Sequence, residues 1–214
     1  MGGGAVEGAL REGGGEPGLK LIETVLWDGE RFPRIMGHLD RLNRSRALLG
    51  WARPGVGFFW KCDLTLPKEP ARVRLTVDAS GKAEWQMAAL PPPKAEWRVG
   101  LAAERLRSDD PWLRVKSTRR EAYDRARAAL PERLDEVLFL NERGEVCEGT
   151  ITNVFFDRGQ GLRTPPLSCG LLPGVLRADL ACPEEVLMAD DLPKVRLWVG
   201  NALRGLIPAV FILG

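Results

Sequence analysis

Short segments in which apolar and polar residues alternate, separated by Gly and Pro, run through most of this 214-residue chain. Alternation with a period of two is typical of β-strands that bury one face. No apolar run reaches the roughly 18 residues of a membrane-spanning helix. The sequence therefore predicts many short strands joined by turns, in a protein that we expect to be cytoplasmic and independent of membranes.

The N-terminal half combines such strands with one amphipathic helix. We expect residues 19–27 and 31–35 to form a hairpin around Asp28-Gly29, because this dipeptide favours a tight turn. Leucines at helical spacing then predict a helix over 38–49, which Gly50 ends. Further strands are predicted over 72–77, 84–90 and 96–102.

The C-terminal half predicts a helix and strands in alternation. Residues 118–130 have a helical composition, whereas 136–140 and 152–156 favour strands. Leu172-Pro173-Gly174 precedes a second helical run through Ala181, so the free N–H groups of that helix would lie beside the loop and could bind an anion.

Composition shifts predict the domain boundaries. Residues 1–18 are rich in Gly and Glu and are interpreted as a flexible leader. The polar segment 108–112 is the predicted interdomain linker, because Ser108-Asp109-Asp110-Pro111 breaks regular structure. The expected domains are then an N-terminal domain over 19–107 and a C-terminal domain over 113–214.

The overall charge excludes some classes of function. Lys and Arg number 31 against 29 Asp and Glu, which gives a net charge of +2 and no global attraction to nucleic acid. The basic segment 114–127 raises a nucleic-acid contact as a rival, but its interleaved Glu121 and Asp124 favour a helix with internal ion pairs. The four cysteines have no metal-ligand spacing and are too few for a disulfide framework, so we expect reduced thiols and no metal.

Lys116 is the first candidate for chemistry. The partly apolar residues 112–115 precede it, and apolar surroundings disfavour the charged form of an amine, as Schiff-base chemistry requires. A surface lysine is the ordinary alternative. His38, the only histidine, is interpreted as a residue at the start of a helix.

An ordered set of motifs carries more weight than any one of them. The motifs are His38-Leu39-Asp40-Arg41-Leu42, Lys116-Ser117-Thr118-Arg119-Arg120, Glu148-Gly149-Thr150-Ile151-Thr152-Asn153, Leu172-Pro173-Gly174 and Gly200-Asn201-Ala202-Leu203. In this order they resemble the class IV aminotransferases, which are pyridoxal 5′-phosphate (PLP) enzymes of fold type IV. The resemblance spans about 19–208 and implies an α+β fold with an α/β N-terminal domain, a pseudo-barrel C-terminal domain and a homodimer.

The resemblance also implies roles for individual residues. Lys116 would carry PLP as a Schiff base and act as acid and base, and Arg41 would bind the cofactor phosphate. Glu148 would face the pyridine nitrogen and keep it protonated. The phosphate would also be bound by two pairs of residues at turns: Val175 and Leu176 through backbone N–H groups, and Asn201 and Ala202.

Two positions depart from the family pattern. Asn201-Ala202 stands where relatives often have a hydroxyl residue, which weakens one phosphate contact. Arg119-Arg120 stands where many relatives have a tyrosine, which makes Arg120 a candidate ligand of a substrate carboxylate or of the phenolic oxygen of PLP. Tyr123, the only tyrosine, could instead belong to the core. Trp27, Trp51 and Trp60 could contribute to a dimer contact or to the core.

The segments 167–177 and 200–209 are most similar to 4-amino-4-deoxychorismate lyases of bacterial type, which act in folate biosynthesis and release 4-aminobenzoate and pyruvate. A branched-chain or D-amino-acid aminotransferase is the alternative, because both reactions begin with the same proton removal. A non-catalytic binding protein is the alternative from another class.

Overall fold

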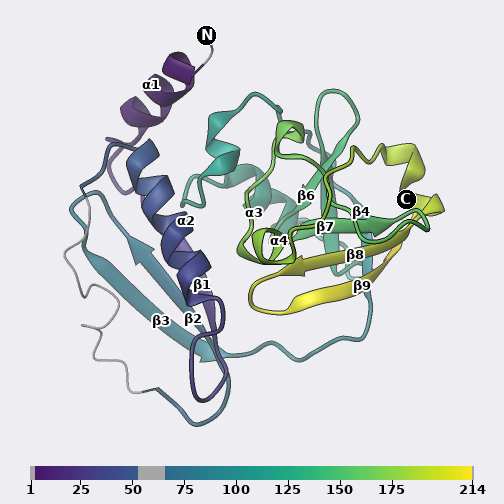
Figure 1. Cartoon of the computed structure of the whole chain (residues 1–214), viewed down its shortest axis with the longest axis horizontal. Helices are drawn as coiled ribbons and strands as arrows, with labels where there is room; N and C mark the ends of the chain where they lie inside the picture. Colours follow the sequence, from purple (N-terminus) through teal and green to yellow (C-terminus); the bar gives the residue numbers. More distant parts are fainter. Residues whose placement is uncertain (1–2, 53–65, 214) are drawn as a thin grey trace. The chain divides into compact units, whose positions relative to one another are not determined.

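The computed structural model describes residues 3–52 and 66–213, and the chain divides into two compact units. The first unit comprises residues 1–92 together with 115–119. The second comprises 93–114 together with 120–214. Figure 1 shows both units coloured along the sequence.

The first unit contains a three-stranded antiparallel sheet in the order β1-β2-β3 and two helices. Apolar side chains of β1 and β2 alternate toward a buried face, and helix α2 packs on β1. The core of this sheet includes Val25, Val73 and Leu75, which are fully buried. The elements are α1 (Gly3–Gly13), β1 (Leu21–Trp27), α2 (Ile35–Leu48), β2 (Ala71–Val77) and β3 (Ala83–Ala89).

The predicted hairpin of 19–27 with 31–35 is wrong, although the turn at Asp28-Gly29 exists. Asp28 Oδ1 accepts hydrogen bonds from the backbone N–H groups of Glu30 and Arg31, which directs the chain into α2 instead of back along β1. The partner of β1 is β2, more than 40 residues later, in a register that pairs Leu21 with Val77. The helix predicted over 38–49 and the strand predicted over 72–77 are found as α2 and β2.

The second unit is a closed barrel of six strands in the order β4-β5-β6-β7-β8-β9. Strand β4 pairs in parallel with both β5 and β9, and this double pairing closes the barrel. All five residues of β5 and of β7 are buried, as expected for strands covered on both faces. The strands are β4 (Trp97–Leu101), β5 (Glu136–Leu140), β6 (Val146–Gly149), β7 (Asn153–Asp157), β8 (Arg196–Asn201) and β9 (Gly205–Phe211).

The barrel unit also contains two helices, α3 (Glu121–Ala128) and α4 (Val175–Leu180). Three short 3₁₀ segments complete it at Pro111–Arg114, Leu167–Cys169 and Ala189–Lys194. The barrel core consists of apolar residues from every strand, among them Val99, Leu138 and Val199. This arrangement agrees with the expected α+β class and pseudo-barrel domain.

The unit boundary differs from the predicted one. Strand β4 lies inside the predicted N-terminal domain 19–107, but it belongs to the barrel because it is the strand that closes it. The predicted linker 108–112 is part of the barrel unit, in which Ser108 donates two hydrogen bonds to Glu142. Residues 115–119 return to the first unit. A local change of composition cannot reveal such a return, because it depends on long-range strand pairing.

The predicted leader 1–18 also differs, since it contains α1. Leu10 of this helix is buried, and the backbone oxygen of Gly14 accepts a hydrogen bond from Trp51 Nε1 at 2.8 Å. Trp27 is buried as well and donates to Pro67 O, so this tryptophan belongs to the core of its own unit. Trp60 lies outside the described residues.

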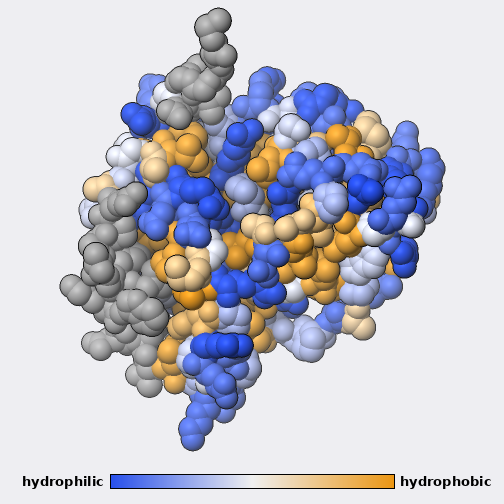
Figure 2. Space-filling view, in the orientation of Figure 1, coloured by the Kyte–Doolittle hydropathy of each residue, from blue (hydrophilic) through white to orange (hydrophobic). Residues whose placement is uncertain are grey.

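On the face shown in Figure 2, hydrophilic and apolar residues are interspersed in both units. Within the described residues, no helix is both long enough and apolar enough to cross a bilayer.

Candidate functional site

Lys116 lies in the short segment 115–119 that runs beside β1 in the first unit. Its backbone oxygen accepts a hydrogen bond from Ile22 N, and Thr118 N donates to Lys20 O, both at 2.8 Å. Val115 and Ser117 are buried on either side, whereas Lys116 itself is half-buried. The backbone of the predicted Schiff-base lysine is therefore held as if it were an additional strand.

Arg41 binds Glu23 of β1, the residue that follows Ile22. On α2, its Nε and one terminal nitrogen donate to the two carboxylate oxygens of Glu23 at 2.9 and 2.5 Å. His38 Nδ1 contacts Glu23 Oε2 at 2.7 Å, and all three side chains are buried. A guanidinium has five N–H donors, so these two bonds leave three for other acceptors such as phosphate oxygens. Strand β1 thus positions both Lys116 and Arg41 within the first unit.

The charge state of Glu23 follows from these contacts. Burial alone raises the pKa of Glu23, but the positive charge of Arg41 and the hydrogen bonds from Arg41 and His38 outweigh it and lower the pKa to about 2. Glu23 is therefore an ionised carboxylate at neutral pH, and the sequence analysis did not identify it. The only available signal was a glutamate at an inward position of an otherwise apolar strand.

Glu148, the predicted partner of the pyridine nitrogen, lies near the end of β6 in the barrel unit and is 5% exposed. Its Oε1 accepts hydrogen bonds from Tyr123 Oη at 2.7 Å and from Leu172 N at 3.1 Å, and its Oε2 accepts one from Asn153 Nδ2 at 3.5 Å. These three donors come from α3, from the loop before α4 and from β7, and together they fix the orientation of the carboxylate.

A second buried carboxylate shapes the loop that follows Glu148. Glu136 is fully buried and accepts hydrogen bonds from the hydroxyls of Thr150 and Thr152 and from Ile151 N. A Cβ on Gly149 would lie 2.4 Å from Thr152 Oγ1 and 2.8 Å from Glu136 Cδ, so only glycine fits there. The motif Gly149-Thr150-Ile151-Thr152 therefore encodes a tight loop around Glu136, which the sequence analysis also missed.

The Leu172-Pro173-Gly174 loop is tied to the same region of the barrel. Asn153 Nδ2 donates to Leu172 O at 3.0 Å, and a Cβ on Gly174 would lie only 1.8 Å from Asn153 Oδ1. Helix α4 begins directly after Gly174, and no described side chain caps its N-terminus. Its first residues, Val175 and Leu176, are buried, and their backbone N–H groups belong to the uncapped first turn.

The turn at Gly200-Asn201-Ala202 packs against the start of α4, because a Cβ on Gly200 would lie 2.8 Å from Leu176 Cδ2. The Asn201 side chain is occupied within its own unit: Oδ1 accepts from the backbone N–H groups of Leu203 and Arg204, and Nδ2 donates to Ile151 O. The two predicted phosphate-binding turns are thus neighbours. At Asn201, the backbone is better placed than the side chain to contact a ligand.

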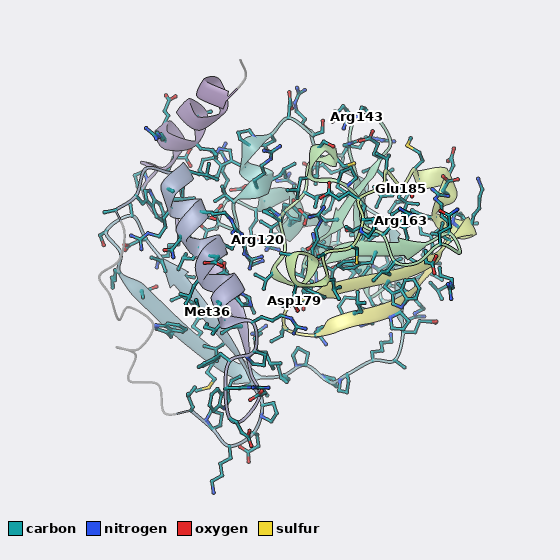
Figure 3. All side chains as sticks on the ribbon, in the orientation of Figure 1. Met36, Arg120, Arg143, Arg163, Asp179 and Glu185 are labelled. Atoms are coloured by element: carbon teal, nitrogen blue, oxygen red, sulfur yellow. The ribbon has the colours of Figure 1, made fainter. Side chains whose placement is uncertain are left out.

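Arg120, labelled in Figure 3, precedes α3 and is engaged by residues of the barrel unit. Its Nε donates to Asp124 at 2.8 Å and its Nη2 to Thr150 O at 3.1 Å, while its guanidinium lies 5.6 Å from the Tyr123 ring centre. The basic segment around it is paired in the same way: Arg125 binds Glu104, and Arg127 donates to Asp135 O. These pairs explain why the segment is not a continuous basic surface.

Cys147 and Cys169 are buried, and Cys182 is half-buried; all three are free thiols. Burial, followed by a hydrogen bond with Glu145 and the charge of that group, raises the pKa of Cys169 to about 12. Burial, followed by the charge of Glu148, raises the pKa of Cys147 further. Cys62 lies outside the described residues. The described thiols are therefore un-ionised, and they contribute packing rather than nucleophiles.

One of the solved structures that share this fold is a PLP-bound form. A hypothetical aminotransferase from Mycobacterium tuberculosis in its PLP-bound form is similar to 93% of this chain with a TM-score of 0.78, at 19% identity and over 83% of its own chain. A putative amino-acid aminotransferase from Mesorhizobium loti is 44% identical, with a TM-score of 0.86, over 91% of this chain and all of that one. The barrel unit and the three-stranded unit together define a PLP-dependent enzyme of fold type IV.

Sequence comparison supports the same conclusion. The model of the amino-transferase class IV family matches residues 20–212. A putative aminodeoxychorismate lyase from Schizosaccharomyces pombe is 32% identical over 167 residues, which cover 75% of this chain and 72% of that protein. The chain belongs to the class IV aminotransferase family. It is accordingly an enzyme that uses PLP to act on a small molecule, and the alternative of a non-catalytic binding protein is excluded.

Proposed function

We propose that this protein is a 4-amino-4-deoxychorismate lyase, which releases 4-aminobenzoate and pyruvate. The observation that carries the proposal is the similarity of 167 residues to a curated relative of that name. A second such relative, the aminodeoxychorismate lyase of Bacillus subtilis, is 50% identical over 42 residues, which are 20% of this chain and 14% of that protein.

The residues present fit the cofactor. The uncapped first turn of α4 offers backbone N–H groups, and such groups bind phosphate. Glu148 offers a carboxylate held by donors, which suits contact with a protonated pyridine nitrogen. Arg41 has N–H groups beyond its two bonds to Glu23. In this proposal the phosphate is bound by Arg41 and by the backbone of Val175, Leu176, Asn201 and Ala202.

Lys116 is the proposed catalytic residue. When bound, PLP supplies an electron-accepting ring that stabilises the charge left by removal of a proton next to the substrate nitrogen. Lys116 Nζ would hold the cofactor covalently, and its free amine would take this proton. Loss of enolpyruvate from the neighbouring carbon makes the substrate ring aromatic, which drives the reaction forward. Glu148 holds the ring-nitrogen proton throughout.

The contacts of Arg120 limit the number of its N–H donors that could bind a substrate carboxylate. Two of its N–H groups are directed to Asp124 and Thr150 O, so a substrate would meet its remaining donors only. A substrate contact made in this way would be weakened by Arg120→Lys, because lysine lacks the planar fork.

An amino-acid aminotransferase is the second candidate, because the putative amino-acid aminotransferase from M. loti is 44% identical to this chain. The two functions are distinguished by incubating the purified protein with 4-amino-4-deoxychorismate and, separately, with amino acids and 2-oxoglutarate. Release of 4-aminobenzoate without a 2-oxo acid supports the lyase. Turnover that depends on a 2-oxo acid and yields no 4-aminobenzoate contradicts it. Lys116→Ala is the matched control and should abolish either activity.

A further inference from the structure

Tyr123 is the only tyrosine of the chain, and no family motif quoted above contains it. It lies on α3, whereas the carboxylate that it contacts lies on β6 of the same unit. Its hydroxyl donates to Glu148 Oε1 at 2.7 Å, which is the usual length of a well-formed O–H···O hydrogen bond. The contact joins two elements that are 25 residues apart in sequence.

The phenol is held from two sides. Its ring meets Phe139 edge-on, with ring centres 5.0 Å apart, and the Arg120 guanidinium lies over it at 5.6 Å. The ring also packs against an apolar cluster of the barrel unit that includes Leu113 and Leu171. Because these contacts fix the ring, the hydroxyl has one direction in which to donate.

The hydroxyl stays protonated over the physiological range. Burial, the charge of Glu148 and the hydrogen bond to it all raise the pKa of Tyr123 well above its ordinary value. An ionised carboxylate is acceptor-only, so this contact is a tyrosine donor to a glutamate acceptor.

The two carboxylate oxygens of Glu148 are held differently. Oε1 receives two donors, Tyr123 Oη at 2.7 Å and Leu172 N at 3.1 Å, which use both of its lone pairs. Oε2 receives Asn153 Nδ2 at 3.5 Å. Oε1 thus receives the two shorter of these three hydrogen bonds, and Oε2 receives the longest.

We propose that Tyr123 is a positioning residue: it holds Oε1 of Glu148 so that Oε2 is presented to the protonated pyridine nitrogen of PLP. This inference rests on the proposed role of Glu148. Tyr123 touches neither the substrate nor the reacting atoms, and it acts only through the orientation of the carboxylate.

The test uses Tyr123→Phe, which removes the hydroxyl and keeps the ring contacts. The apo forms of wild type and variant are titrated with PLP and with its carbocyclic analogue, in which C–H replaces the ring nitrogen. We expect the dissociation constant for PLP to rise about threefold to tenfold in the variant, as for the loss of one ordinary hydrogen bond, because the hydroxyl acts on PLP only through Glu148. That for the analogue should change by less than about twofold, because the analogue cannot make the contact that Tyr123 supports.

Thr164→Val is the matched control. It also removes a buried hydroxyl from the barrel unit, one that donates to Val154 O, but it does not touch Glu148. We expect it to leave the preference for PLP over the analogue unchanged, even if it lowers thermal stability. Equal weakening of PLP and analogue by Tyr123→Phe would show a purely structural role and overturn the inference, as would no change in either. If the wild-type apo protein binds neither compound, the proposed function fails first.

Discussion

Two buried glutamates, one in each unit, are stabilised in opposite ways. Glu23 of the three-stranded unit is neutralised by the guanidinium of Arg41 and contacted by His38. Glu148 of the barrel unit is held by a hydroxyl, a side-chain amide and a backbone N–H. The first arrangement uses the carboxylate to fix a cation, whereas the second fixes the carboxylate itself. We infer from this difference that Glu23 supports the fold and orients Arg41, whereas we propose that Glu148 faces the cofactor.

Glu23→Gln should break the first arrangement most severely. The substitution keeps the shape but leaves the buried Arg41 without its carboxylate, and breaking a buried ion pair from one side costs about 3–5 kcal/mol. The free energy of unfolding, measured by urea titration at pH 7, should fall by this amount. Glu84→Gln is the control, because its ion pair with Lys20 is exposed and should contribute less than about 1 kcal/mol. Equal losses in the two variants would contradict the assignment.

Lowering the pH should also separate the wild type from Glu23→Gln by their loss of stability. The pKa of Glu23 is about 2 in the folded protein and 4.5 as its ordinary value, so its stabilisation is complete above about pH 4.5 and is lost as the pH falls toward 2. A shift of this size corresponds to about 3 kcal/mol. Urea titrations from pH 6 to pH 2.5 should therefore show a smaller loss of stability in Glu23→Gln than in wild type.

The pKa values of Glu142 and Glu145 are also lowered to about 2, by hydrogen bonds from Ser108 and from Arg143 respectively. The wild type and Glu23→Gln both retain Glu142 and Glu145. Part of the loss of stability at low pH should therefore persist in Glu23→Gln. If the two acid profiles are parallel over the whole range, the Glu23 network does not carry the stabilisation assigned to it.

Glu148→Gln should affect catalysis strongly and stability only slightly, the opposite of the effect expected for Glu23→Gln. A glutamine retains one acceptor for the hydroxyl and the backbone N–H, so the free energy of unfolding should change by only about 1 kcal/mol. The kcat should fall roughly 10–100-fold, because a neutral amide supports a protonated pyridine nitrogen less well than a carboxylate does. Borohydride reduction followed by mass spectrometry should still locate PLP on Lys116. An unchanged kcat, or a loss of stability as large as that of Glu23→Gln, would contradict the comparison.

Gly174→Ala tests how closely the loop Leu172-Pro173-Gly174 packs against Asn153, one of the residues that donate to Glu148. The new methyl group would overlap Asn153 Oδ1, so the loop or Asn153 must move, at a cost of about 1–3 kcal/mol. Asn153→Ala in the same chain should recover part of that loss, which a double-mutant cycle measures.

Gly8→Ala is the matched control for Gly174→Ala, since the structure describes open space around this position of α1. In a helix this change should stabilise slightly, by up to about 1 kcal/mol. If both glycine variants change the unfolding free energy alike, the fit of Gly174 against Asn153 is not the cause.

Much of the local structure could be predicted from the sequence. The strand Glu136–Leu140 has the predicted bounds, and the helix predicted over 38–49 is found at Ile35–Leu48. The family motifs predicted the fold class and the cofactor, because the residues that bind a shared cofactor recur in a fixed order. The individual roles of Lys116, Arg41 and Glu148 remain predictions that the experiments above test.

Long-range contacts decided the rest. The pairing of β1 with β2, the inclusion of β4 in the barrel and the return of 115–119 to the first unit join residues far apart in sequence, and a local pattern carries no record of its partner. Glu23 and Tyr123 show the same limit for side chains. Each is an unremarkable polar residue in its own segment, and its role became visible only when folding brought Arg41 or Glu148 within hydrogen-bonding distance.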